Sequence, residues 1–252
     1  ENYTLKLSWL LPAVVWAPIA QASPEPLVFL SEQNAPVNYE DSSRSPAGFS
    51  VELLHLMWQQ MSESPKKIHF FPWARAYYIA QTKANTVLFA TSRTPDRENM
   101  FKWVCPISES NVVLVHRKTD RFNLASATNP EKVTIGVVRA DIAEEIVTAK
   151  MQSRVQLIKA GNIEQTLQLL KAGKVDMIAA YEPVLYNAMD RLGVAQADYK
   201  KDMVLQRMTD CYAFNRSTSD SVILQYQQAL TAVRQTPKYA ELKKRYPMLQ
   251  FQ

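Results

Sequence analysis

Short apolar runs and helical periodicities alternate in the first part of the chain. Residues 27–30 have the length and composition of a buried strand, and the apolar residues of 51–61 recur on one helix face. The same patterns predict strands at 68–71 and 87–91, with a helix at 74–83 between them. An order of strand, helix and strand is typical of a parallel sheet with crossover helices. The first part of the chain is therefore predicted to be an α/β unit.

A second unit with the same alternation follows a predicted strand at 111–117. No internal repeat and no low-complexity linker separates it from the first unit. Two such units are expected to hold a ligand between them, at the carboxyl ends of their strands. The remaining predicted strands are 133–138, 155–158, 175–179, 203–207 and 211–215, and the remaining helices are 142–150, 163–170, 182–192, 219–234 and 238–245.

The N-terminal segment has a different character. Lys6 precedes an apolar run that is interrupted by Pro12 and Pro18, and small residues at Ala20 and Ala22 follow it. This pattern predicts a cleaved signal peptide over residues 1–22 and a periplasmic location. The prolines and the short length argue against a transmembrane helix. A buried first helix is the alternative.

Composition narrows the function. The chain has 252 residues, 47% of them hydrophobic, which is enough for a sizeable core. The net charge of +5 is spread along the chain without a Lys/Arg block or a nucleic-acid motif, so it predicts no nucleic-acid partner and weakly favours an anionic ligand. The three histidines show no metal-ligand spacing, and the sequence predicts neither a metal site nor a cofactor.

Four segments of the chain together form a recognisable pattern. They are Pro36-Val37-Asn38-Tyr39 with Gly48-Phe49-Ser50-Val51-Glu52-Leu53-Leu54, Thr91 to Glu98, Gly136 to Asp141, and Gly173 to Ile178. In these segments the chain resembles the family 3 extracellular solute-binding proteins, the receptors of polar amino-acid uptake systems. Two further segments look like a subgroup of that family whose ligands are poorly defined, Pro72-Trp73-Ala74-Arg75-Ala76 and Phe101-Lys102-Trp103-Val104.

The resemblance implies a fold and a function. The fold class is α/β, a two-lobed periplasmic binding protein of type II (a Venus-flytrap), with two parallel or mixed sheets joined by two hinge strands. Lobe one is expected at 24–105 plus 212–252, and lobe two at 106–211. Such a monomer delivers a small polar, carboxylate-bearing solute, an amino acid or a related organic acid, to the membrane permease of an ABC transporter.

The resemblance also points to ligand-binding residues in the first lobe. Arg97 matches the arginine that grips a ligand carboxylate, because a guanidinium pairs with both carboxylate oxygens. Ser92 matches a polar position beside that grip, while Tyr39 and Trp73 match aromatic walls. The alternatives are a surface role for Arg97 and packing under a loop for the two rings. Glu32 ends the first strand and either binds a ligand cation or caps a loop.

The second lobe departs from the family pattern. Arg139 and Asp141 stand where the family has a glycine and a hydroxyl residue, and Asp141 is either an N-cap or a ligand contact. Tyr181 occupies the position of the Asp that pairs with a ligand ammonium, which puts the ammonium half of recognition in doubt. Glu182 either takes that role or, as we favour, starts the next helix. Arg93 faces either the cleft or solvent.

The resemblance also bears on the two cysteines. In the family the two crossing strands run side by side, which would bring Cys105 and Cys211 together. Export to an oxidising compartment permits the bond. We therefore expect a Cys105–Cys211 disulfide; the alternative is a pair of buried thiols.

Three functions compete with the transport receptor. The first is a soluble ligand-binding partner of a sensor. The second is a dehydratase-like enzyme on the same fold, for which Glu32 or Glu182 could supply an acid or base, although no catalytic dyad supports it and we expect no enzyme. The third is a structural or adhesive protein, which would have no use for an arginine at a cleft.

Overall fold

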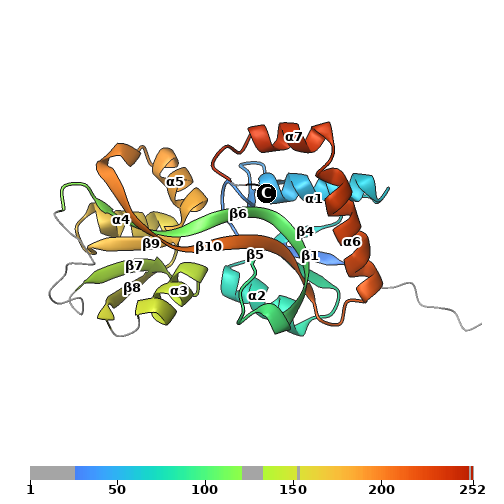
Figure 1. The fold of residues 1–252 in the computed structure, drawn as a ribbon, viewed down its shortest axis with the longest axis horizontal. Helices are drawn as coiled ribbons and strands as arrows, with labels where there is room; N and C mark the ends of the chain where they lie inside the picture. Colours follow the sequence, from blue (N-terminus) through green and yellow to red (C-terminus); the bar gives the residue numbers. More distant parts are fainter. Residues whose placement is uncertain (1–25, 121–132, 152–153, 250, 252) are drawn as a thin grey trace, which may run out of the picture.

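The computed structural model describes residues 26–120, 133–151, 154–249 and 251, and its main feature is one mixed sheet of eight strands. The predicted signal peptide, 1–22, lies outside the described residues. The sequence predicted two sheets joined by two hinge strands; in the structure two long strands continue through both halves and make them one continuous sheet (Figure 1). The strand order is β4 (Ile68–Phe70), β1 (Val28–Ser31), β5 (Thr86–Ser92), β10 (Tyr199–Asn215), β6 (Phe101–Arg117), β9 (Met177–Tyr181), β7 (Thr134–Val138) and β8 (Gln156–Ala160).

The first half contains the parallel strands β4, β1 and β5, as the alternation of elements predicted. Helices pack on both of its faces: α1 (Phe49–Gln60), α2 (Trp73–Thr82), α6 (Asp220–Val233) and α7 (Pro237–Lys244). Its core is aromatic. Phe29 meets Trp58 edge to face with ring centroids 5.1 Å apart, and the Trp58 indole nitrogen donates a hydrogen bond to the Tyr226 hydroxyl at 3.2 Å. Trp58 is thus a core residue.

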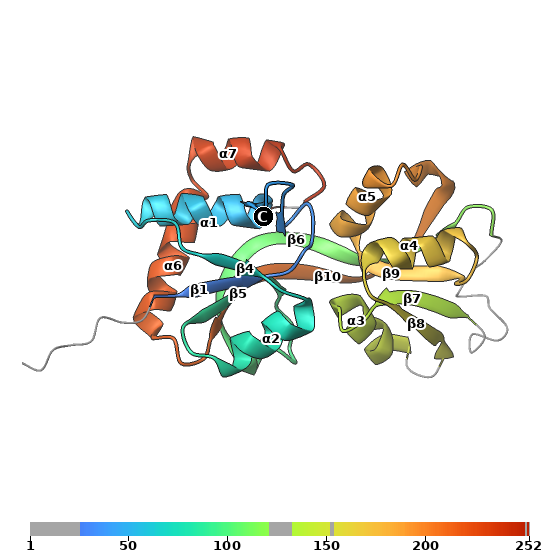
Figure 2. The same ribbon diagram turned by 180° about the vertical axis from the view of Figure 1, so that it is seen from behind.

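The second half contains β7 between its parallel neighbours β8 and β9, with helices α3 (Ile142–Met151), α4 (Ile163–Lys171) and α5 (Glu182–Arg191). Helix α4 begins at an N-cap, Asn162, whose side-chain oxygen accepts a hydrogen bond from the Gln165 backbone nitrogen at 2.9 Å. Figure 2 shows α2 and α3 on the same side of the long strands, one in each half. The beginnings of these two helices contribute to the site described below.

The long strands β6 and β10 have 17 residues each and pair antiparallel from Phe101–Asn215 to Arg117–Tyr199. The sequence predicted only 111–117 of β6, because Ser108, Glu109 and Ser110 interrupt the apolar pattern although all three are buried. For the same reason β10 was predicted as two strands. The short elements β2 (Tyr39–Glu40), β3 (Pro46–Ala47) and the 3₁₀ turns η1 (Glu98–Met100) and η5 (Gln196–Asp198) were not predicted.

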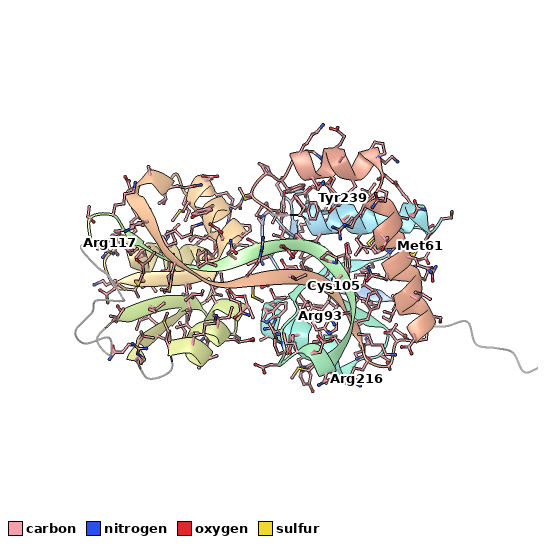
Figure 3. All side chains as sticks on the ribbon, viewed as in Figure 1. Met61, Arg93, Cys105, Arg117, Arg216 and Tyr239 are labelled. Carbon is pink, nitrogen blue, oxygen red and sulfur yellow. A yellow bond between two sulfur atoms is a disulfide. The ribbon has the colours of Figure 1, made fainter. Side chains whose placement is uncertain are left out.

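A disulfide joins the two long strands within the first half. Cys105 on β6 and Cys211 on β10 are bonded, and their Cα atoms are 4.7 Å apart (Figure 3). Cys211 is fully buried. The predicted bond is therefore present in the structure. Within the described residues, no helix has the length and apolar composition needed to cross a bilayer.

The Cys105–Cys211 bond should contribute to stability, because it closes a loop with a sequence separation of 106 residues. We expect the Cys105→Ser, Cys211→Ser double variant to lower the free energy of unfolding by about 2–5 kcal/mol. Chemical denaturation under non-reducing conditions measures this difference. Thiol counting on unreduced, denatured wild-type protein is the direct check, and two free thiols per chain would show that the bond does not form.

Candidate functional site

A small cavity of about 30 Å³ lies where the two halves meet, and it adjoins an open cleft of about 670 Å³. Its walls come from the carboxyl ends of parallel strands in both halves, which is where the fold class predicts a ligand. The long strand β10 contributes one further side chain. The lining residues are Glu32, Asn34, Val37, Trp73, Ala90, Ser92 and Arg97 from the first half, Asp141, Ile142 and Tyr181 from the second, and Asp210 from β10.

Arg97 is the cationic side chain of this cavity. Only 3% of the residue is exposed, and its guanidinium carbon lies 5.3 Å from the ring centroids of both Trp73 and Tyr77. These rings hold a buried cation through the negative face of their π-systems. The alternative of a surface arginine is therefore wrong. The guanidinium also donates a hydrogen bond of 3.5 Å to the Ser92 carbonyl oxygen.

The charge of Arg97 is met by a carboxylate from the other half. Arg97 Nη2 lies 2.5 Å from Glu145 Oε1, and Glu145 is in the first turn of α3. The Glu145 side chain itself is 49% exposed, so the ion pair lies at the boundary between the cavity and solvent. Glu145 was not among the predicted site residues, and nothing in the local sequence indicates that it reaches Arg97.

Asp210 is a buried carboxylate that sequence reasoning also missed. It is 3% exposed, and it accepts a hydrogen bond from Ser92 Oγ at 2.8 Å and another from the Tyr181 hydroxyl. Burial raises its pKa, the hydrogen bonds from Tyr181 and Ser92 partly oppose that effect, and the resulting pKa is about 6. Its position next to Cys211, in the predicted crossing strand, could have indicated that it lies between the two halves.

Two predicted carboxyl groups share the cavity with Asp210. Burial and the nearby charge of Asp141, partly opposed by Arg97, together raise the pKa of Glu32 to about 8. Burial likewise raises the pKa of Asp141 to about 6. Asp141 accepts a hydrogen bond from the Ile142 backbone nitrogen at 2.6 Å, so it both precedes helix α3 and lines the cavity. Within the described residues, no cluster of His, Cys, Asp and Glu could hold a metal ion.

The remaining predicted residues lie outside the small cavity. Tyr39 lines a neighbouring hollow of about 390 Å³, and Arg139 is exposed in the wider cleft. Arg93 pairs with Glu98 at 2.5 Å and faces outward, beside the disulfide (Figure 3). Glu182 begins α5, as favoured from the sequence, and its carboxylate pairs with a lysine of β10.

Four other lining residues were not predicted. Asn34 and Val37 belong to the loop that follows β1, and Ala90 lies within β5. Ile142 is next to a predicted residue, Asp141. These four residues could have been predicted from their closeness in sequence to the predicted residues, because adjacent positions of the chain reach the same edge of the sheet.

Solved structures share the fold of this chain. A histidine kinase sensor domain with similarity to periplasmic binding proteins has a TM-score of 0.77 at 15% identity, covering 90% of this chain and 98% of that one. An ABC uptake transporter substrate-binding protein from Streptococcus pneumoniae with bound histidine has a TM-score of 0.76 at 13% identity, covering 88% and 92%. An ancestral amino acid-binding protein, a precursor of cyclohexadienyl dehydratase, has a TM-score of 0.71 at 15% identity, covering 88% and 94%.

These likenesses define the class of the fold as the α/β fold of periplasmic binding proteins. The sequence adds the family. Residues 27–249 match the bacterial extracellular solute-binding proteins, family 3, so the chain belongs to that family. A search of curated proteins found no match.

The raised carboxyl pKa values predict how stability depends on pH. Asp210 keeps its proton in the folded protein up to about pH 6, whereas the unfolded chain loses it near pH 3.8. The folded state therefore binds more protons between these values, and its free energy of unfolding falls as the pH rises through them. For Asp210 alone the fall is on the order of 3 kcal/mol.

Urea denaturation of the ligand-free protein between pH 4 and pH 8 measures this dependence. We expect the Asp210→Asn variant to show a smaller fall, because it carries no titrating group at that position. Glu241→Gln, which neutralises an exposed carboxylate on α7, is the control and should follow the wild type. Parallel curves for wild type and Asp210→Asn would contradict the assignment.

Proposed function

We propose that the protein is a periplasmic receptor that binds a small polar solute carrying a carboxylate and delivers it to the permease of an ABC transporter. Membership of family 3 supports a solute-binding role. The observation that carries the proposal is the buried Arg97 in a cavity lined by both halves. A desolvated guanidinium of this kind requires an anionic partner, and a ligand carboxylate can supply it.

Glu145 supports the carboxylate as the recognised group. Its side chain already brings a carboxylate oxygen to 2.5 Å from Arg97 Nη2. A ligand carboxylate that binds Arg97 takes the place of this internal carboxylate. Because Glu145 is half exposed, it can turn out to solvent and lose little when the ligand arrives.

The proposed mechanism of capture is closure of two lobes, 24–105 with 212–252 and 106–211, around β6 and β10. The cavity takes its walls from both halves, so a ligand within it contacts both at once. Ligand contacts that form only when the halves are together favour the closed state over the open one.

A dehydratase-like enzyme is the second candidate function. Glu32 lines the cavity with its pKa raised to about 8, which would keep its carboxyl group protonated at neutral pH and able to act as a general acid. The fold is also similar to that of an ancestral amino acid-binding protein that is a precursor of cyclohexadienyl dehydratase, which is a second reason to test for enzyme activity. Turnover assays on cyclic and hydroxylated acids distinguish this enzyme from the receptor. A soluble partner of a sensor remains the third reading, and a pull-down against sensor ectodomains tests it.

Arg97→Ala should abolish most ligand binding. A thermal-shift screen of amino acids, hydroxy acids and dicarboxylates first identifies a bound compound, and calorimetry then measures its affinity. We expect the variant to weaken binding by about 2–4 kcal/mol, because the ligand carboxylate is left unpaired in a buried site. Arg93→Ala is the matched control, since Arg93 belongs to the same turn but pairs with the exposed Glu98. Equal affinities of wild type and Arg97→Ala would remove Arg97 from the site.

Closure should be visible in solution. We expect small-angle scattering to give a smaller radius of gyration at saturating ligand than without ligand, because the bound solute holds the two halves together. Glu145→Gln should enlarge the radius of the ligand-free protein, since it weakens an ion pair between the halves. An unchanged radius of the wild type at saturation would count against a hinged receptor.

A further inference from the structure

The pairing of the two long strands is irregular at the disulfide. In the described register of these strands, Asp210 and Tyr212 of β10 have partner residues on β6, but Cys211 between them has none. Over the same stretch β6 carries more residues than β10, and Cys105 is one of the described residues without a partner on β10. The strand β6 therefore bulges at this point, and the sulfur–sulfur bond joins the two strands across the bulge.

The bulge of β6 makes its hydrogen bonds to a helix. The Cys105 backbone nitrogen donates to Gln227 Oε1 at 3.0 Å, and Gln227 Nε2 donates to the Cys105 carbonyl oxygen at 2.8 Å. Gln227 lies on α6. The next residue of β6 is Pro106, which has no backbone N–H to donate. At this point β6 is therefore attached to α6 by hydrogen bonds and to β10 by the disulfide.

The disulfide lies one residue from the cavity along β10. Cys211 follows Asp210, whose carboxylate accepts hydrogen bonds from Ser92 and Tyr181. On its other side Cys211 pairs with Thr91 of β5, the residue before Ser92, and a second register shift follows there. The pairing is thus irregular on both sides of Cys211, and the covalent bond restrains β10 next to the residue that carries the buried carboxylate.

We propose that the Cys105–Cys211 bond is a redox switch of the cavity: a dithiol reduces it in the folded protein, and its loss loosens the segment of β10 that holds Asp210. A carboxylate that is held less firmly must be ordered when a solute arrives, so the solute binds more weakly. Reduction and loosening stand apart from the proposed function, whereas the consequence for solute binding rests on it.

The two sulfur atoms differ in access and in the charge beside them. Cys211 is fully buried, whereas Cys105 is partly exposed. Arg93 Nη1 lies 3.8 Å from Cys105 Sγ (Figure 3), and Glu98 fixes the same guanidinium by accepting a hydrogen bond from its Nε at 2.7 Å. A cation beside a sulfur atom attracts an approaching thiolate and stabilises the thiolate form of that cysteine. Cys105 is therefore the sulfur that an external dithiol meets.

The exchange takes place in two steps. A thiolate of the dithiol attacks Cys105 Sγ, the protein's sulfur–sulfur bond breaks, and Cys211 leaves as a thiolate that takes up a proton. The second thiolate of the reductant attacks its own sulfur partner in the mixed disulfide, and Cys105 leaves as a thiolate beside Arg93. The dithiol is oxidised to a disulfide, and its electrons and protons pass to the protein, which gains a pair of thiols.

The first experiment measures whether the bond is reduced in the folded protein. Wild-type protein is incubated with dithiothreitol in buffer without denaturant, N-ethylmaleimide in denaturant then traps the thiols, and mass spectrometry counts them. We expect reduction without urea, and several-fold slower reduction of Arg93→Gln. Arg75→Gln, which removes an exposed arginine that lies over Phe71, is the charge-matched control and should follow the wild type. A bond that dithiothreitol reduces only in urea overturns the switch.

The second experiment measures what reduction loosens. Hydrogen–deuterium exchange of the ligand-free protein is compared before and after reduction. We expect exchange of peptides over 208–214 and 88–93 to rise by roughly tenfold or more, while residues 134–138 of β7 keep their rate. The Cys105→Ser, Cys211→Ser variant should match the reduced protein. Exchange that does not change, or that rises equally in β7, overturns the switch.

A matched pair of variants tests the attachment of the bulge to α6. Gln227→Ala removes both hydrogen bonds to Cys105 and should raise exchange over 101–107, whereas Gln225→Ala changes an exposed neighbour that binds Glu63 and should not. Equal exchange over 101–107 in the two variants overturns this attachment.

Calorimetry measures the consequence for the cavity, with the compound that the thermal-shift screen identifies. We expect the Cys105→Ser, Cys211→Ser variant to bind this compound several-fold more weakly than the oxidised wild type, while circular dichroism shows that it is folded. Equal affinity of the two proteins overturns the switch and leaves the receptor standing. Failure of the oxidised wild type to bind any compound of the screen overturns the proposed function, and the reduction and exchange measurements are unaffected by it.

Discussion

The antiparallel pairing of β6 with β10 is the contact on which the arrangement of this molecule depends. Each strand has 17 residues, and together they form the centre of the sheet, with β5 of the first half beside β10 and β9 of the second half beside β6. The carboxyl ends of β5 and β9 bring Ser92 and Tyr181 to this pair, and both side chains donate to Asp210 on β10. A register shift in the long pair would therefore separate the site residues as well as the two halves. The Cys105–Cys211 bond restrains this pair within the first half.

The fold was largely predictable because the apolar positions in each of its short elements follow a single periodicity, that of a helix or that of a strand. Residues 51–61 and 163–170 show the spacing of one apolar helix face, and helices were found there with ends that differ by at most two residues. The pattern failed where polar residues are buried. Ser108, Glu109 and Ser110 read as a break in the sequence, yet they lie inside a continuous strand whose neighbours cover them. Predictions from periodicity assume that buried positions are apolar. At the centre of the sheet, close to the cavity, buried positions are polar, so the prediction fails there.

The structure brings several of the predicted site residues into one cavity and adds partners that the sequence did not indicate. The resemblance to solute-binding proteins indicated Arg97, Ser92 and Trp73, since these residues belong to short motifs that are visible in one segment of sequence. The partners of these residues are distant: Glu145 is 48 positions from Arg97, and Asp210 is 118 positions from Ser92. No local pattern encodes such a pair, because the sheet topology alone brings it together. Tyr181 stands where the family pattern has an Asp. Its hydroxyl donates a hydrogen bond to Asp210, a carboxylate that comes from a different strand.

Burial accounts for the protonation of the carboxyl groups that line the cavity. Removing water from Glu32, Asp141 and Asp210 penalises their charged forms, which raises the pKa of each carboxyl group. Arg97, the basic side chain of the same lining, meets its counter-charge in the Glu145 carboxylate of the other half. The contact between the halves therefore brings opposite charges together at the edge of the cavity, whereas its interior favours neutral carboxyl groups.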